Sequence, residues 1–193
     1  MVAAKLSRPR PRDRRCRRPA GVWRSWLACY AGVWALTLAT AVVVAAAGPL
    51  LQGPVRRLLA LHLSAASTPQ PGIGHVFAVA AHNIPVCCWP LLLGFAGADR
   101  GHLGRRVADA LVAVSVAVNV LQVGVAAGAY GARLVAFVPQ LPLEWAALAL
   151  GAAGWRVQRR DPLTVRGGLG VLMVAAVLLL GAGFLETFAV PHG

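Results

Sequence analysis

The stretch PQLPLEWAALALGAAGW, residues 139–155, decides how the chain is interpreted. It places one carboxylate, Glu144, in an apolar run long enough to enter a lipid bilayer, with two prolines before it and small residues after it. An ionisable group at membrane depth costs about 2.5–3.5 kcal/mol on insertion scales, so such groups are usually paired and often functional. The rest of the sequence has to explain how Glu144 is tolerated.

The composition indicates an integral membrane protein. Of the 193 residues, 58% are hydrophobic and only 13% are charged, whereas soluble domains carry roughly 25% charged residues. The 19 basic and 6 acidic residues give a net charge of +13, which would indicate nucleic-acid binding in a soluble protein. Here the basic residues lie at the ends of apolar runs, so membrane topology accounts for most of them. We therefore expect the lipid bilayer as a partner and do not expect nucleic acid.

Five apolar runs predict an all-α membrane fold, because each approaches the ~20 residues that cross a hydrocarbon core. The expected spans are residues 27–51, 75–97, 108–130, 134–155 and 168–190. Residues 1–26, rich in arginine and proline, are predicted to form a basic, disordered cytoplasmic tail, and residues 27–193 a single membrane domain. The amphipathic residues 54–67 are expected to lie on the outer surface as a short interfacial helix. The prolines leave open whether residues 134–144 form a full helix or a broken, re-entrant one.

The basic residues also predict an orientation, because cytoplasmic segments of membrane proteins are enriched in lysine and arginine. If the N-terminus is cytoplasmic, sixteen basic residues fall in cytoplasmic segments, and only Arg56, Arg57 and Arg133 fall outside. This asymmetry predicts a multi-pass protein of the cell membrane with an extracytoplasmic C-terminus. Asp109, at the cytoplasmic start of the third span, is interpreted as a helix-start charge.

The strongly polar residues of the expected spans all fall between the membrane midplane and its outer face. They are His82, Asn83, Asn119, Gln122, Gln140, Glu144 and Glu186. If they face one another, they form one outward-facing polar cluster. This cluster can hold the bundle together through interhelical hydrogen bonds of roughly 0.6–2 kcal/mol each. Alternatively, it can bind an ion, a proton or a ligand, as broken helices beside carboxylates do in transporters. Four prolines near the cluster are expected to interrupt the second and fourth spans: Pro85, Pro90, Pro139 and Pro142.

Metal, cofactor and catalytic motifs are not found in the sequence. The four cysteines lack metal-ligand spacing, and adjacent Cys87 and Cys88 are interpreted as small buried side chains. Neither an HExxH nor a GxSxG motif occurs, so we expect a non-enzymatic protein without a cofactor. The Gly124-xxx-Gly128 pair predicts close helix contact, within the protein or with a partner.

Several segments resemble the stage II sporulation protein M family of bacterial membrane proteins. Residues 139–154 are similar to the family's Pro-His-Gly-x-x-Glu-Leu-Pro-Ala segment and the small-residue helix after it, and residues 183–191 resemble its final Glu-containing helix. Asn83 and Asn119 resemble residues of its second and third helices. Gln140-Leu141 stands where the family has His-Gly, and Trp145-Ala146-Ala147 where it has Leu-Pro-Ala.

The resemblance covers residues 75–191 and implies a membrane scaffold, because the sporulation member works with peptidoglycan-degrading partners. Our first hypothesis is therefore a non-enzymatic scaffold or assembly partner for cell-envelope proteins, acting with other membrane proteins or with itself as a homo-oligomer. The alternative is a transporter or channel component with an outward-facing polar site around Glu144 and Glu186.

Overall fold

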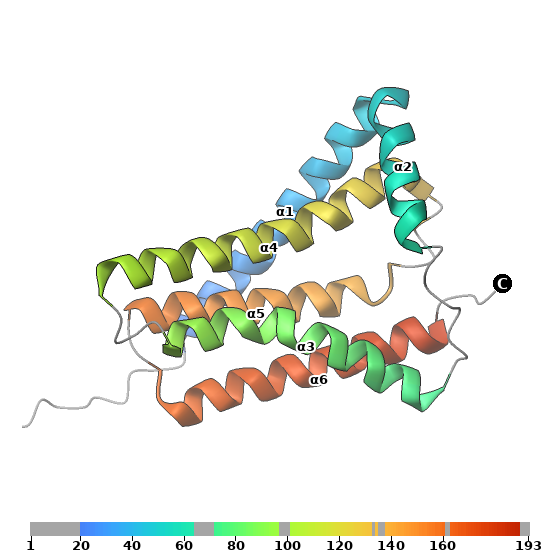
Figure 1. The fold of residues 1–193 in the computed structure, drawn as a ribbon. Helices are drawn as coiled ribbons and strands as arrows, with labels where there is room; N and C mark the ends of the chain where they lie inside the picture. The colour runs from blue at the N-terminus through green and yellow to red at the C-terminus, as the bar shows by residue number, and fades with distance from the viewer. Residues whose placement is uncertain are drawn as a thin grey trace, which may run out of the picture.

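The fold is built from helices throughout the part of the chain that the structure describes. This computed structural model describes residues 20–63, 72–96, 101–132, 134, 138–160 and 163–189, so the predicted tail before residue 20 lies outside it. The helices are α1 (Ala20–Ala46), α2 (Pro49–Leu63), α3 (Ile73–Ala96), α4 (His102–Tyr130), α5 (Leu141–Arg160) and α6 (Val165–Ala189) (Figure 1).

Four of these helices, α1, α3, α4 and α6, are long and apolar enough to cross a membrane. Their outer faces carry large exposed apolar side chains, and such surfaces are tolerated where they meet lipid. Examples are Leu38, Val42, Phe77, Val114, Val118 and Val177. The prediction of an all-α, multi-pass membrane fold is confirmed, and these four helices match the first, second, third and fifth expected spans.

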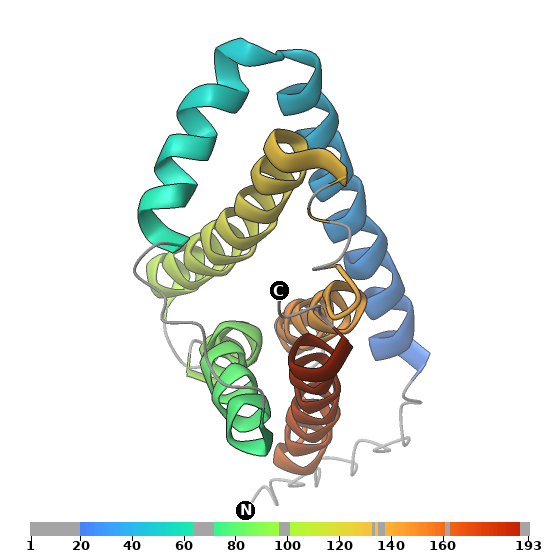
Figure 2. The same ribbon diagram turned by 90° about the vertical axis from the view of Figure 1, so that its right-hand side faces the viewer.

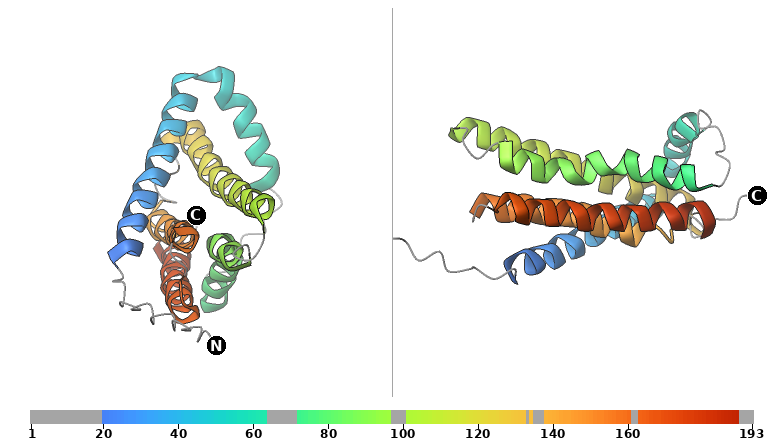
Figure 3. Two further views of the ribbon diagram at one scale, coloured as in Figure 1. Left: turned by 90° about the vertical axis from the view of Figure 1, so that its left-hand side faces the viewer. Right: turned by 90° about the horizontal axis from the view of Figure 1, so that it is seen from below.

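Helix α5 takes the place of the fourth expected span, but it is more polar than the other four because it lies inside the bundle. Every residue from Trp145 to Gly151 is buried, and α5 packs against α1, α3 and α6. Figure 3, on the left, looks along the bundle and shows α5 surrounded by these helices. A helix that meets protein on most sides can carry polar residues that a lipid-facing helix cannot.

The five long helices run alternately up and down. Gly183 of α6 meets Val76 of α3, and Gly168 meets Phe95, so α3 and α6 are antiparallel. Gly124 and Gly128 of α4 lie against α1 in parallel order. The side view in Figure 3, on the right, shows the long helices extending between the same two ends of the molecule.

Helix boundaries differ from the expected ones near the N-terminus. α1 begins at Ala20, inside the segment assigned to the tail, and ends at Ala46, five residues before the expected end of the span. Gly48 adopts a positive φ of 57°, which glycine tolerates well, and Pro49 then begins α2. A helix is therefore present where an interfacial helix was predicted, as α2, but it starts at residue 49 rather than 54; its place at the membrane surface stays a prediction.

The prediction that prolines interrupt the helices is wrong for the second expected span, whereas the fourth expected span is interrupted by a turn at Pro139 and Gln140 before α5 begins. α3 runs without a break from Ile73 to Ala96 with Pro85 and Pro90 inside it; membrane helices tolerate proline where neighbours satisfy the freed carbonyls. Pro139 precedes α5 and Pro142 lies in its first turn, where a missing N–H costs no helical hydrogen bond. Residues 135–137 of the predicted re-entrant segment lie outside the described residues.

Glycines bring the helices into close contact. A Cβ atom on Gly151 would collide with the carbonyl oxygen of Cys87 in α3, and one on Gly128 would lie 2.5 Å from the carbonyl oxygen of Ala41 in α1. The expected close contact of Gly124-xxx-Gly128 is thus made inside the chain, with α1. Small residues at helix contacts are typical of membrane bundles.

Candidate functional site

A cavity with several polar residues lies between α3, α4 and α5, with Leu179 of α6 in its wall. Its volume is about 160 Å³, and four of its lining residues are polar: Asn83 of α3, Asn119 and Gln122 of α4, and Glu144 of α5. All four belong to the seven residues that the sequence singled out. The cavity exists because α4 packs along α1 and α2 and makes little contact with α3 and α5. Figure 2 shows α4 diverging from α5 and α6, whereas α1 runs beside both α4 and α5.

Glu144 is positioned by the start of α5. It lies in the first turn of that helix rather than in the middle of a long helix, as the sequence predicted, and a carboxylate there interacts favourably with the helix dipole. Asn83 lies ten residues into α3, about 15 Å from that helix end at 1.5 Å per residue. Because Asn83 and Glu144 meet, the start of α5 is recessed by about 10 Å relative to the start of α3.

The hydrogen bonding of Glu144 is weak. Asn83 donates from Nδ2 to Oε1 of Glu144 at 3.4 Å, and this is the one hydrogen bond to the Glu144 carboxylate found within the described residues. Asn119 donates instead to the carbonyl oxygen of Ser115 on its own helix, at 2.8 Å, and Gln122 is exposed. The polar residues therefore line a common space without satisfying one another.

Glu186 of α6 does not line the cavity but lies within electrostatic range of Glu144. The positions of Glu144 and Glu186 along the bundle axis can be compared through Gly181 of α6. A Cβ atom added to Gly181 would lie 3.2 Å from the side chain of Leu143, the residue before Glu144. Glu186 is five residues beyond Gly181 and three residues before the end of α6, so it lies between the cavity and that end of the bundle. When both carboxylates are ionised, their charges repel each other.

His82 and Gln140 lie apart from the cavity. His82 is exposed on the outer side of α3, because successive helical residues point about 100° apart and Asn83 takes the inward direction. Gln140 lies in the turn before α5, where its Oε1 is buried and has no hydrogen-bond partner among the described residues.

The remaining cavity wall is mostly apolar and includes two side chains to which the sequence analysis gave no site role. Cys87 lies one turn after Asn83, and Trp145 directly follows Glu144; both are buried and line the cavity. The i, i+4 spacing of Asn83 and Cys87 was a signal that these two residues share a face. The indole Nε1 of Trp145 is buried without a partner in the described structure.

Aromatic side chains of α1 fix the beginning of α5. Trp26 donates from Nε1 to the carbonyl oxygen of Ala146 at 3.0 Å, and the Tyr30 hydroxyl donates to the carbonyl oxygen of Pro142 at 3.5 Å. The rings of Trp26 and Tyr30 stack at 5.7 Å between centroids. Glu144 lies between these two anchored carbonyl groups in the sequence, so α1 helps to set its position.

The donor set of the cavity consists of oxygen and amide groups. Among the described residues, no group of three or more His, Cys, Asp or Glu side chains could hold a metal ion. One carboxylate with amide oxygens is a hard donor set, suited to small cations that also keep water ligands.

Comparisons of the chain with models of protein families, with curated proteins and with solved structures find no match. The resemblance to the stage II sporulation protein M family stays a prediction from the sequence.

Proposed function

We propose that this chain is a non-enzymatic transporter or channel component of the cell membrane that binds a small monovalent cation in the cavity beside Glu144. The observation that carries the proposal is that Asn83, Asn119, Gln122 and Glu144, from three helices, line one cavity of about 160 Å³. A cavity of that size with polar walls holds about five water molecules, which is enough for a partly hydrated ion.

The balance of charge supports a cation. Glu144 has one neutral partner among the described residues, at 3.4 Å, and Glu186 adds a second negative charge within electrostatic range. A buried carboxylate without a cationic partner is costly, and a bound cation removes that cost. A purely structural cluster would instead pair its polar groups directly.

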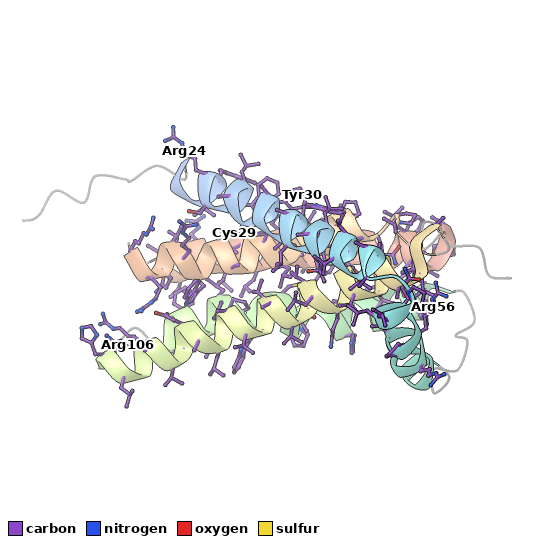
Figure 4. All side chains as sticks on the ribbon, turned by 90° about the horizontal axis from the view of Figure 1, so that it is seen from above. Arg24, Cys29, Tyr30, Arg56 and Arg106 are labelled. Atoms are coloured by element: carbon purple, nitrogen blue, oxygen red, sulfur yellow. The ribbon has the colours of Figure 1, made fainter. Side chains whose placement is uncertain are left out.

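The arginine distribution supports an orientation with the N-terminus in the cytoplasm. Seven arginines of the described chain lie near the end of the bundle where α1, α4 and α6 begin and α5 ends: Arg24, Arg105, Arg106, Arg156, Arg159, Arg160 and Arg166. Arg56 and Arg57 of α2 lie near the opposite end, and Figure 4 shows Arg24 and Arg106 far from Arg56. The positive-inside rule makes the first end cytoplasmic, so the cavity is nearer the outer face.

Glu144→Gln tests the proposal. Proteoliposomes with the purified chain should pass sodium, potassium or protons above the protein-free background, measured with ion-sensitive dyes. Glu144→Gln should lower that flux at least tenfold, because the amide removes the charge that attracts the cation. His82→Gln, a change at the exposed residue next to Asn83 but outside the cavity, should leave the flux unchanged.

Direct binding gives a second measurement. The transported cation should raise the melting temperature of the wild-type chain, because a ligand at 100 times its Kd stabilises the folded state by about 2.7 kcal/mol. Glu144→Gln should abolish this shift. The absence of both flux and cation-dependent stabilisation in the wild type would refute the proposal.

A scaffold for cell-envelope proteins is the second candidate, and the outer face of α4 favours it. Leu111, Val114, Val118 and Leu121 are all exposed and recur every three or four residues, which makes an apolar stripe that another membrane protein or a second copy can contact. The resemblance to the sporulation family implies the same role. A scaffold should keep partner recruitment in Glu144→Gln, and substitutions on the α4 stripe should abolish it.

A further inference from the structure

A second pocket lies at the arginine-rich end of the bundle, between α1, α4 and α5. Its volume is about 460 Å³, and Arg156, Arg159, Arg160, Trp155 and Asp109 contribute to its walls. The pocket is separate from the Glu144 cavity, because the two share no lining residue. Three guanidinium groups and one carboxylate give it a positive charge.

Interactions among the pocket residues do not neutralise this positive charge. Arg159 forms an ion pair with Asp109 at 2.6 Å, and Arg156 lies within electrostatic range of the Cys29 thiol. No second ion pair is found for the pocket among the described residues. The pocket therefore has two guanidinium groups for which the described carboxylates provide no partner.

Two further polar atoms of the pocket residues lack partners. Trp155 Nε1, a donor, and Asp109 Oδ1, an acceptor, are buried and have no hydrogen-bond partner in the described chain. Buried polar atoms are normally paired, so both atoms indicate a missing binding partner. A phosphate oxygen would accept from the indole N–H, and a hydroxyl group would donate to the carboxylate.

The position of the pocket indicates where such a partner comes from. Arg156, Arg159 and Arg160 lie in the last turns of α5, and Asp109 is seven residues into α4, about 10 Å from its start. The pocket is therefore at the depth of lipid headgroups rather than in the hydrocarbon core. Anionic lipids attract basic pockets between helices at the cytoplasmic side.

We propose that this pocket binds the phosphodiester headgroup of an anionic phospholipid, with the guanidinium groups on the phosphate and Asp109 on a headgroup hydroxyl. The planar guanidinium group matches two phosphate oxygens at once. Phosphatidylglycerol has the required phosphate, negative charge and hydroxyl groups, whereas phosphatidylcholine has a compensating cation and no headgroup hydroxyl.

Native mass spectrometry of the full chain in detergent tests the proposal with phosphatidylglycerol and phosphatidylcholine as probes. Phosphatidylglycerol should stay bound and phosphatidylcholine should not. Arg156→Gln and Arg160→Gln should each weaken phosphatidylglycerol binding about fivefold. Arg166→Gln, which removes the same charge at the same end but outside the pocket, should leave binding unchanged. Trp155→Phe, which keeps the ring and removes the N–H donor, should also weaken binding about fivefold.

Three outcomes would overturn the proposal. An equal loss in Arg166→Gln would mean that surface charge, not the pocket, attracts the lipid. Displacement of phosphatidylglycerol by equimolar inorganic phosphate would make this a site for a soluble anion. If the glutamine variants do not fold, Arg156→Lys and Arg160→Lys are measured in their place. Unchanged phosphatidylglycerol binding in both lysine variants would exclude recognition by the guanidinium groups.

Discussion

At the residue scale, Glu144 occupies a place that is costly for stability. The helix dipole at the start of α5 favours its charge, but its hydrogen bond from Asn83 is long and Glu186 repels it. Residues kept in unfavourable surroundings often serve function at the expense of stability. This interpretation leads to a prediction about the stability of the ligand-free chain.

Glu144→Gln should stabilise the ligand-free protein while it abolishes cation binding. The amide removes the repulsion from Glu186 and the cost of a partly buried charge, so we expect a gain of about 1–2 kcal/mol. For a chain of this length, each kcal/mol of added stability raises the melting temperature by about 2–4 °C. Thermal unfolding without added sodium or potassium measures the effect. A lower melting temperature would show that the carboxylate is a structural group.

Four of the seven predicted site residues share the cavity, and helical spacing accounts for the two that lie on α4. Asn119 and Gln122 are three residues apart, so they lie on one face of α4. The sequence could not show that His82 lies outside the cavity. Which side of α3 faces inward is fixed only by the tertiary contact of Asn83 with Glu144. Residues 134–140 were counted as part of the helix, whereas α5 begins at Leu141; Glu144 is nevertheless level with Asn83, near the middle of α3, because the start of α5 is recessed.

At the element scale, the contact of α3 with α5 depends on one missing side chain. Gly151→Ala should destabilise the protein by about 1–3 kcal/mol, because its Cβ atom would meet the backbone carbonyl of Cys87, which cannot move independently. Gly170→Ala is the matched control: nothing lies within 4 Å of its Cβ position, so alanine should be neutral or stabilising through its helix propensity. Chemical unfolding of both variants measures the difference, and equal stabilities would contradict the close packing.

Helix α2 is attached to the end of α4 through Arg56. Its Nε donates to the carbonyl oxygen of Ala129 at 2.8 Å, and its guanidinium lies 5.8 Å from the centroid of the Tyr130 ring. Arg56→Met should release α2 locally, because a charged hydrogen bond to a helix end is worth about 1.5–3 kcal/mol. Amide hydrogen exchange in α2 should then accelerate at least tenfold, while exchange in α5 stays unchanged. Arg57→Met, a change at the exposed neighbour, is the control, and equal acceleration in both variants would contradict the assignment.

Apolar runs predicted the lipid-facing helices better than the central one. α1, α3, α4 and α6 follow directly from hydropathy because lipid contact demands apolar residues. α5 is covered by other helices and can therefore contain Glu144 and Gln158, so its ends could not be found from hydropathy alone. The ion pair of Asp109 with Arg159 was likewise missed, because its partner lies 50 residues away in the sequence.

At the scale of the whole molecule, the number of crossings depends on α5. Five crossings would place the two ends of the described chain on opposite sides of the membrane. If α5 failed to cross, the four most apolar helices would return the chain to the side on which it started. The packing of α5 along α1, α3 and α6 favours the five-crossing arrangement.

Reporter fusions at two positions distinguish these topologies. With five crossings and a cytoplasmic N-terminus, a fusion after Arg160 lies in the cytoplasm and a fusion after Gly193 lies outside. With four crossings, both positions change sides, because α5 would leave Arg160 outside and α6 would bring Gly193 in. A fluorescent protein active only in the cytoplasm and a phosphatase active only outside should therefore give opposite signals at the two sites. Phosphatase activity after Arg160, together with fluorescence after Gly193, would refute the crossing of α5, and Glu144 would then have to reach the membrane interior from a helix that enters and leaves on the same side.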